Sequence, residues 1–203
     1  MKKNKISKNW IRKQHRDIYV RSSKIHGYRS RSAFKLIEID KKFRLFLNKK
    51  TLLDLGSSPG GWTQIATKKI IKGKILSVDL KKMDPIANSK FILGNFLMQE
   101  VKNEILDYFD EKIDIIISDM APNTTGNKNL DSLATGELCL EAMNFSKNII
   151  KKNGFFVSKI FMGSNFNEIL NIAKGLFKNV SIFKPKSSRK ESKENYIICK
   201  NLK

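Results

Sequence analysis

Apolar residues in this chain gather into seven short runs, each bordered by polar, glycine or proline residues. A short apolar run with such borders is typical of a β-strand buried in a sheet. The pattern predicts strands at residues 51–55, 74–80, 89–93, 113–118, 155–161, 180–183 and 196–199.

Apolar residues at helical spacing fill most of the intervals between these runs. Ser32 is placed to cap a helix in which Ala33, Leu36 and Phe43 share one face. Further helices are predicted from Trp62 onward and over residues 98–109, 131–152 and 166–177. Alternating strands and helices predict an α/β fold, with a mostly parallel seven-stranded sheet and helices on both faces. No helix separates the final two strands, so the last strand should run antiparallel to its neighbour.

The domain organisation follows from the same pattern. Residues 1–30 show no sustained period, whereas the alternation continues from there to the C-terminus without an internal repeat or a linker. We therefore expect a basic arm at residues 1–30 and a single domain at residues 31–203. A chain of 203 residues is long enough to bury a full core.

A glycine-rich segment at residues 56–61 joins the first predicted strand to the helix that begins at Trp62. Strand, glycine loop and helix form the first unit of a nucleotide-binding α/β sheet. A P-loop is excluded because no Gly-Lys-Ser/Thr sequence follows. The dinucleotide fingerprint fails because Ser58 replaces its second glycine. The pattern favours a nucleoside ligand without a pyrophosphate; the alternative is that the glycines only form a turn.

Asp79 ends the second predicted strand, 23 residues after Gly56. An acid about 20 residues beyond the glycines is placed to bind the hydroxyls of a ribose. The alternative is that Asp79 caps a turn before Lys81.

The net charge of +21 indicates a polyanionic partner, most simply nucleic acid. The abundance of Lys, Asn and Ile is also typical of an AT-rich genome, but the charge is uneven: residues 1–35 contain twelve Lys or Arg and one acid, Asp17. Trp10, Tyr19 and Tyr28 lie among these cations. They are candidates for stacking on bases while the cations hold phosphates, or for docking the arm on the domain.

The remaining composition excludes several classes of protein. No apolar stretch is long enough to span a membrane, and the basic N-terminus lacks the apolar region of a secretory signal. Cys139 and Cys199 lack a metal-ligand spacing, and His15 and His26 are too far apart to suggest a metal site. We expect a reduced cytoplasmic protein without a metal or a membrane partner.

Residues 54–62 and 118–123, together with residues 83–86, resemble the FtsJ-type S-adenosylmethionine-dependent ribose methyltransferases. The resemblance runs from about Tyr28 to the C-terminus and implies a Rossmann-like methyltransferase fold. It also implies contacts to S-adenosylmethionine from Gly60, Trp62, Asp79, Asn95 and Asp119. Asn95 departs from the family, which commonly has an aspartate near the adenine. An asparagine keeps the acceptor oxygen but lacks the charge.

The family's Lys-Asp-Lys-Glu tetrad falls on Lys35, Asp119, Lys159 and Glu194. The ribose 2′-hydroxyl is a poor nucleophile until its proton is accepted, and a free lysine has a pKa of about 10.4. We assign Lys159 as the base and expect its pKa to be lowered by burial and a neighbouring cation. Lys35 would be that cation and a substrate contact, while both acids would orient the lysines. The alternative for each lysine is a role without function: Lys35 would be a solvated side chain, and Lys159 would extend from its strand to the surface.

The resemblance implies 2′-O-methylation of a uridine ribose in the A-loop of 23S rRNA, by a monomer acting on the large ribosomal subunit. Two alternatives stay open, a tRNA ribose 2′-O-methyltransferase and a non-catalytic RNA-binding factor in ribosome assembly. The intact tetrad argues against the second. A nucleobase methyltransferase is disfavoured because residues 119–122 differ from the Asn/Asp-Pro-Pro-Tyr type of motif.

Overall fold

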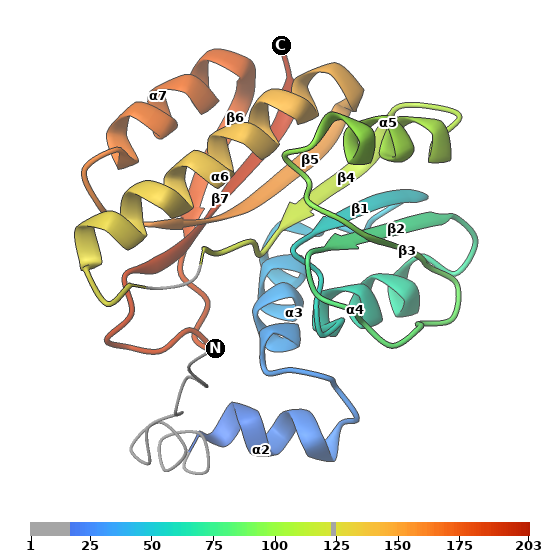
Figure 1. The fold of residues 1–203 in the computed structure, drawn as a ribbon, viewed down its shortest axis with the longest axis horizontal. Coiled ribbons are helices and arrows are strands. Elements are labelled where there is room, and N and C mark those ends of the chain that lie inside the picture. The colour runs from blue at the N-terminus through green and yellow to red at the C-terminus, as the bar shows by residue number, and fades with distance from the viewer. Residues whose placement is uncertain (1–16, 123–124) are drawn as a thin grey trace.

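A seven-stranded sheet organises the chain, which a computed structural model describes over residues 17–122 and 125–203 (Figure 1). The strands are β1 (Thr51–Leu55), β2 (Lys74–Asp79), β3 (Lys90–Leu93), β4 (Ile113–Ser118), β5 (Ile150–Phe161), β6 (Phe177–Phe183) and β7 (Glu194–Leu202). Their order is β3-β2-β1-β4-β5-β7-β6. Neighbours from β3 to β5 pair in parallel, and β7 is antiparallel to both β5 and β6. The α/β fold and the antiparallel last strand predicted from the sequence are confirmed.

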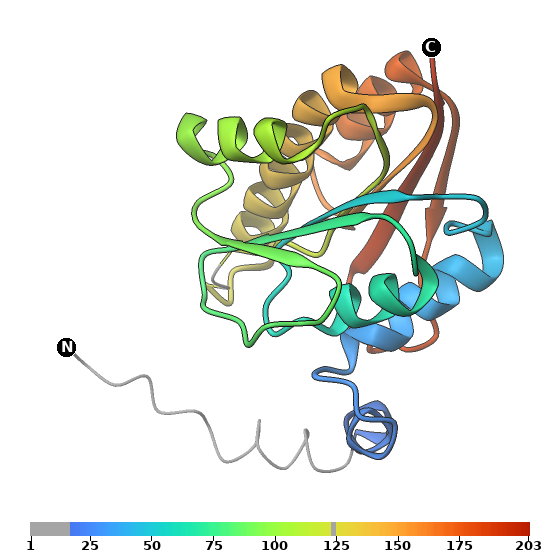
Figure 2. The ribbon, with the colours of Figure 1, turned by 90° about the vertical axis from the view of Figure 1, so that its right-hand side faces the viewer.

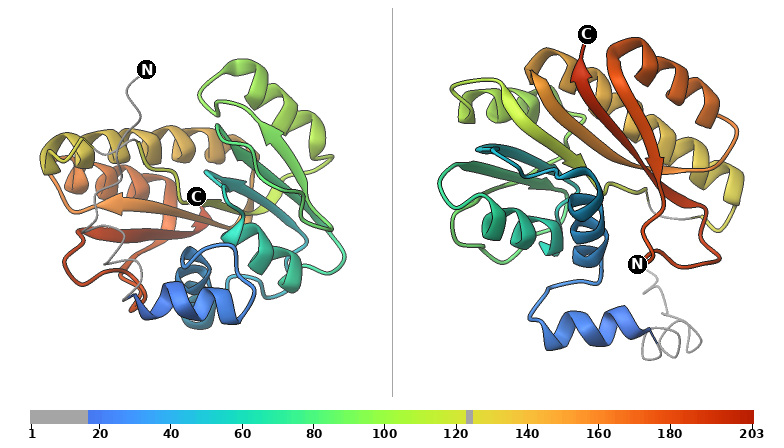
Figure 3. Two further views of the ribbon diagram at one scale, coloured as in Figure 1. Left: turned by 60° about the horizontal axis from the view of Figure 1, so that its bottom comes forward. Right: turned by 180° about the vertical axis from the view of Figure 1, so that it is seen from behind.

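Helices cover both faces of this sheet, as Figure 2 shows. α3 (Ser32–Phe43) and α4 (Gly61–Lys69) pack on one face, and α5 (Gln99–Tyr108), α6 (Lys128–Ile149) and α7 (Phe166–Leu176) pack on the other. A further helix, α2 (Ile18–Ile25), lies beside the N-terminal end of α3 (Figure 3). Within the described ranges, none of the helices is long and apolar enough to cross a membrane.

The central strands are apolar on both faces because each face is covered by helices. In β1, Leu52 packs under α3 and α4, whereas Leu53 and Leu55 face the opposite layer. In β4, Ile117 likewise packs under α3 and α4, whereas Ile116 faces the opposite layer. The strand order reverses between β1 and β4, and ligands of open α/β sheets bind outside the carboxyl ends of the strands at such a point. The topology therefore selects the segments after β1 and β4 as the position of a site.

Two helices were predicted to run into residues that belong to strands in the structure. The helix predicted to reach residue 152 ends at Ile149, and Ile150 begins β5 by pairing with Ile113. The register then shifts before Ile115 pairs with Phe155, which accommodates the intervening polar residues. Phe177 likewise begins β6, where it pairs with the C-terminal strand. In both cases strand pairing with a distant segment overrides the local helical period.

The sequence did not predict α2, whose packing depends on partners outside it. Asp17 caps the helix by accepting a hydrogen bond from the backbone N–H of Tyr19 at 3.0 Å. The rings of Tyr19 and Tyr28 each lie 5.5 Å from the ring of Phe34 on α3, measured between centroids. Tyr19 and Tyr28 therefore serve to dock this segment on the domain. Trp10 lies outside the described residues.

Candidate active site

Two glycines shape the loop that follows β1. Gly56 has a φ of 76°, and a Cβ atom there would lie 2.7 Å from the Cγ atom of Met120, in the segment after β4. Gly60 has a φ of 108° and stands at the N-terminal end of α4. Both positions favour glycine because other residues rarely adopt these angles. The glycines thus allow the segments after β1 and β4 to approach each other closely.

Arg29 fastens this glycine loop to the segment that follows β2. Its guanidinium donates hydrogen bonds to the carbonyl oxygens of Pro59 at 3.3 Å, Asp84 at 2.6 Å and Pro85 at 2.8 Å. The backbone N–H of Arg29 also donates to the side chain of Gln64 on α4 at 2.8 Å. Arg29 belongs by sequence to the basic arm, but these contacts make it part of the framework around the glycine loop.

A cavity of about 1030 Å³ lies at the carboxyl ends of β1, β2, β3 and β4, with α6 along one side. Of the five residues predicted to bind the cofactor, Asp79, Asn95 and Asp119 line it. Trp62 does not, because its indole is buried against Tyr196 and donates to the backbone carbonyl of Ser32 at 2.8 Å. A contact from Trp62 to a ligand would therefore have to use its backbone N–H, in the first turn of α4.

Gly60 is also absent from the lining of the cavity. A Cβ atom at Gly60 would lie 2.7 Å from the side chain of Ile86 and 2.9 Å from that of Met83. In this structure the glycine thus allows close packing against the segment after β2. The predicted cofactor contact of Gly60 stays a prediction.

Asp79 accepts two backbone hydrogen bonds at the edge of the cavity, from Ser58 and Lys81, both at 2.8 Å. The alternative role of Asp79, the cap of a turn before Lys81, is therefore present in the structure. A carboxylate has about four acceptor positions, so two remain for ribose hydroxyls. Asn95 uses its side-chain oxygen to accept from the backbone N–H of Leu97 at 3.0 Å. Asn95 thus shapes a turn and lines the cavity at the same time.

The four residues of the predicted tetrad converge from four elements. Lys159 on β5 lies 2.7 Å from the Oδ1 atom of Asp119, which follows β4. Lys35 on α3 lies 2.7 Å and 2.8 Å from the two carboxylate oxygens of Glu194, at the start of β7. The two ion pairs meet because Nζ of Lys159 is also 3.9 Å from Oε2 of Glu194. The structure therefore brings together all four residues in one charged cluster.

This cluster is shielded from solvent. Lys35, Lys159 and Glu194 are each 9% exposed or less, so neither lysine is a solvated surface side chain. Buried charges persist when they are paired and hydrogen-bonded, and both lysines meet that condition here.

Tyr196 and Ser188 also contact the cluster, and neither residue was predicted from the sequence. The hydroxyl of Tyr196 donates to Oδ1 of Asp119 at 2.8 Å. Tyr196 follows Glu194 by two residues on β7, so strand periodicity could have placed both on one face. The hydroxyl of Ser188 donates to Oε1 of Glu194 at 2.8 Å. Ser188 lies in a loop without periodicity, so the sequence carries no signal for this contact.

The expected lowering of the Lys159 pKa is wrong for this structure. Burial disfavours the ammonium form, but the carboxylates of Asp119 and Glu194 outweigh burial and raise the pKa of Lys159 above its ordinary value. Burial likewise works against the charged form of Asp119, yet the cations of Lys159 and Lys35 lower its pKa overall. Lys159 is therefore protonated and paired with Asp119 at neutral pH.

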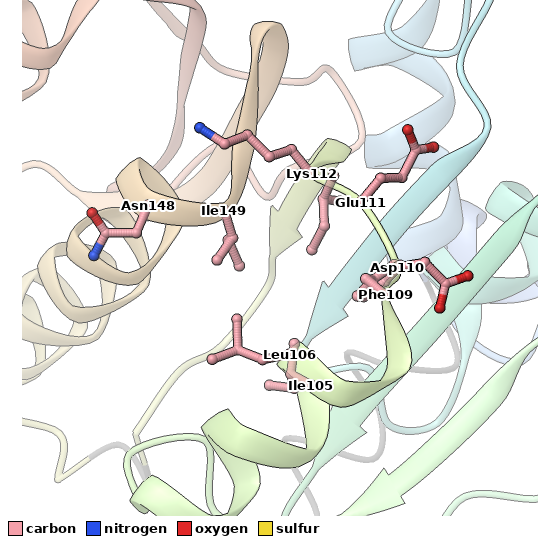
Figure 4. Close-up of a pocket in the computed structure, with 9 residues that line it drawn as sticks. Ile105, Leu106, Phe109, Asp110, Glu111, Lys112, Asn148 and Ile149 are labelled. Carbon is pink, nitrogen blue, oxygen red and sulfur yellow. The ribbon is translucent and has the colours of Figure 1, made fainter.

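A smaller hollow of about 390 Å³ lies between the end of α5, the start of β4 and the end of α6 (Figure 4). It is lined by apolar side chains such as Leu106 and Ile149 together with Asp110, Glu111 and Lys112. This hollow is at the amino end of β4 and contains none of the predicted functional residues. The larger cavity beside the charged cluster is the candidate active site.

Known proteins that are similar to this chain are methyltransferases, in agreement with the predicted active site. The model of a family described as FtsJ-like methyltransferase matches residues 28–202. The chain belongs to this family. Within it, a protein of Pelagibacter ubique (strain HTCC1062) named ribosomal RNA large subunit methyltransferase E is 57% identical over 203 residues, covering 100% of both chains. A protein of the same name from Rickettsia akari (strain Hartford) is 44% identical, covering 97% of this chain and 89% of its own length.

A solved structure supports the FtsJ-like fold. A ribosomal RNA methyltransferase from Plasmodium falciparum superimposes with a TM-score of 0.78 at 38% sequence identity, covering 86% of this chain and 98% of that chain. The resemblance and the methyltransferase activity predicted from the sequence are confirmed by these matches. As an FtsJ-like methyltransferase, the chain places its charged tetrad directly beside the cavity, because Asp119 belongs to both.

Proposed function

We propose that this protein methylates the 2′-hydroxyl of a uridine ribose in the A-loop of 23S rRNA, within the large ribosomal subunit. The observation that carries the proposal is the buried pairing of Lys159 with Asp119 and of Lys35 with Glu194 beside the cavity that Asp119 lines. The names of the relatives support large-subunit rRNA as the substrate. A net charge of +21 suits a polyanion of this kind.

The cavity lining fits S-adenosylmethionine. Apolar side chains such as Leu80 and Leu97 suit a purine, and the free acceptor positions of Asp79 suit ribose hydroxyls. The carboxylate of Asp119, at the end toward the tetrad, suits a positively charged group. When bound, S-adenosylmethionine supplies the methyl group as an electrophile. Asp79→Ala should weaken its binding strongly in calorimetry, whereas tight NAD binding without a response to S-adenosylmethionine would contradict the proposal.

Lys159 is the proposed base for the ribose hydroxyl. Its ammonium must release a proton before it can accept one, and Asp119 and Glu194 hold that ammonium in place. Lys35 neutralises Glu194, so that the net charge around Lys159 stays balanced. The chain therefore contributes orientation and proton transfer, and positioning supplies much of the rate in an in-line methyl transfer.

The proposal is tested by adding the purified protein and S-adenosylmethionine to 50S subunits isolated from a strain in which the gene for this protein has been deleted. Wild-type protein should transfer a methyl group to one 23S rRNA nucleotide, and Lys159→Ala should reduce kcat by about 10²–10⁴-fold, as expected for loss of a general base. Lys152→Ala is the matched control, because Lys152 lies on the same strand with an exposed side chain. Nearly full activity in Lys159→Ala would remove this residue from the mechanism. Methylation of free tRNA in place of 50S subunits would redirect the substrate assignment.

The basic arm is the proposed source of additional affinity for RNA. Residues 1–16 contain seven Lys or Arg, and Asp17 begins the segment that is fastened to the domain through its ion pair with Arg31. Deleting residues 1–16 should weaken binding to 50S subunits and flatten its salt dependence, while cofactor binding persists. An unchanged salt slope would show that these cations do not contact RNA. The proposed setting is the cytoplasm, with the protein acting as a monomer.

A further inference from the structure

The connection between β6 and β7 forms a turn that is fastened to α3. Within the turn, the backbone N–H of Ser188 donates to the carbonyl oxygen of Pro185 at 3.0 Å. The two carboxylate oxygens of Glu38 on α3 accept from the backbone N–H groups of Lys186 at 2.6 Å and Ser187 at 2.9 Å. The turn is therefore held by the helix that also carries Lys35.

A second attachment comes from the segment before α3. The guanidinium of Arg31 donates to the carbonyl oxygen of Ser187 and pairs with Asp17, the N-cap of α2. Asp17 also lies 3.8 Å from Arg189 in the same connection. The turn is thus tied at its backbone to α3 and to the N-cap residue of that helix, and through the Arg189 side chain to the N-cap of α2, which fixes the position of the side chains that it carries.

One of those side chains reaches the charged cluster. The hydroxyl of Ser188 donates to Oε1 of Glu194 at 2.8 Å, and Ser188 is only 5% exposed. The same Oε1 atom lies 2.7 Å from Nζ of Lys35, while Oε2 lies 3.9 Å from Nζ of Lys159. Ser188 thus contributes an uncharged contact that fixes the orientation of the Glu194 carboxylate between the two lysines.

We propose that Ser188 is a positioning residue: the turn anchored on α3 fixes Ser188, and the Ser188 hydroxyl holds the Glu194 carboxylate against both lysines. This inference rests on the proposed function. A glutamate side chain has three rotatable bonds. Without the hydroxyl, Lys35 would still hold the carboxylate closely, but the longer contact of 3.9 Å to Lys159 would be free to open as the carboxylate turns. Ser188 therefore contributes to catalysis through its hydrogen bond to Glu194.

Ser187→Ala provides a matched control for Ser188→Ala. Ser187 is fully buried, and within the described residues its hydroxyl has no hydrogen-bond partner. Ser188→Ala should lower kcat on 50S subunits by about tenfold, the size expected for losing one hydrogen bond to a charged group. KM for S-adenosylmethionine and for 50S subunits should stay within about twofold, because the hydroxyl acts on the orientation of a catalytic carboxylate. Ser187→Ala should match the wild type, and equal kcat values for the two alanine variants would overturn the inference.

A double-mutant cycle with Glu194→Gln separates positioning from a structural role. If Ser188 acts through Glu194, adding Ser188→Ala to Glu194→Gln should change kcat by less than about twofold. A full additional tenfold loss in the double variant would contradict the inference. Ser188→Thr keeps the hydroxyl and tests the same contact even if the alanine variant does not fold. Its kcat should stay within about threefold of the wild type, and a loss of tenfold or more would contradict the inference.

The controls distinguish this inference from the proposed function. An inactive wild-type protein would contradict the proposed function itself, whereas full activity in Glu194→Gln would remove Glu194 from the mechanism and overturn the inference about Ser188 with it. An active wild type and a slow Glu194→Gln variant, combined with an unaffected Ser188→Ala variant, would overturn only the role of Ser188.

Discussion

Asp54 offers a quantitative test of the electrostatics beneath the glycine loop. This β1 carboxylate is fully buried, and one of its oxygens accepts from the hydroxyl of Thr63 at 2.7 Å. The other oxygen has no hydrogen-bond partner within the described residues. Burial raises the pKa of Asp54 to about 7, the Thr63 hydroxyl opposes this, and the negative charges of Asp119 and Asp79 add to it.

The raised pKa makes the folded state less stable as the pH increases. Between the ordinary pKa of 3.8 and the folded pKa of about 7, the folded chain binds more protons than the unfolded chain. The contribution of Asp54 to the free energy of unfolding is therefore fully present below pH 3.8 and is lost as the pH rises through about 7. The gap is about three pH units, and each unit corresponds to about 1.4 kcal/mol, so the total loss is about 4 kcal/mol.

Asp54→Asn should remove this dependence, because an amide has nearly the same shape as the protonated acid and does not titrate. Urea unfolding of both proteins at pH 5 and pH 8 measures the effect, since every other titrating group is shared. Relative to the variant, the wild type should lose about 2–3 kcal/mol of unfolding free energy between these two pH values. A stability difference that is the same at pH 5 and pH 8 would refute the raised pKa and the burial argument behind it.

Three further predictions concern the proposed active site. Arg29→Lys loses the forked guanidinium contacts that join the glycine loop to the segment after β2, so calorimetry should show S-adenosylmethionine binding weakened several-fold, by about 1 kcal/mol. The salt dependence of RNA binding should not change; a weaker salt dependence with normal cofactor affinity would show that Arg29 contacts RNA. Asn95→Asp should tighten cofactor binding by about 1 kcal/mol and Asn95→Leu should weaken it; equal affinities would place Asn95 outside the site. Because the pKa of Lys159 is raised, kcat should rise about tenfold per pH unit through neutral pH, and a plateau near pH 7–8 would contradict Lys159 as a base with a raised pKa.

The sequence by itself determined the order of the strands and of the helices from α3 onward, and the edge of the sheet that carries the site. Buried parallel strands read as continuous apolar runs, and the carboxyl ends of such strands meet at one edge. Asp79 and Asp119 each end or follow one of these runs, so both could be placed beside the glycine loop without a structure. The family resemblance added Lys35, Lys159 and Glu194, which the sequence could name but could not bring into contact.

Tertiary structure alone decided how these groups behave. Lys35 and Glu194 are separated by 159 positions in the chain but share a hydrogen bond, and the raised pKa of Lys159 depends on two carboxylates from other elements. The same holds for Ser188, whose contact with Glu194 exists because Glu38 and Arg31 hold a distant turn in place. Charge interactions and hydrogen bonds depend on distances in space. A local pattern fixes which residues lie on which strand, whereas the packing of distant segments sets those distances.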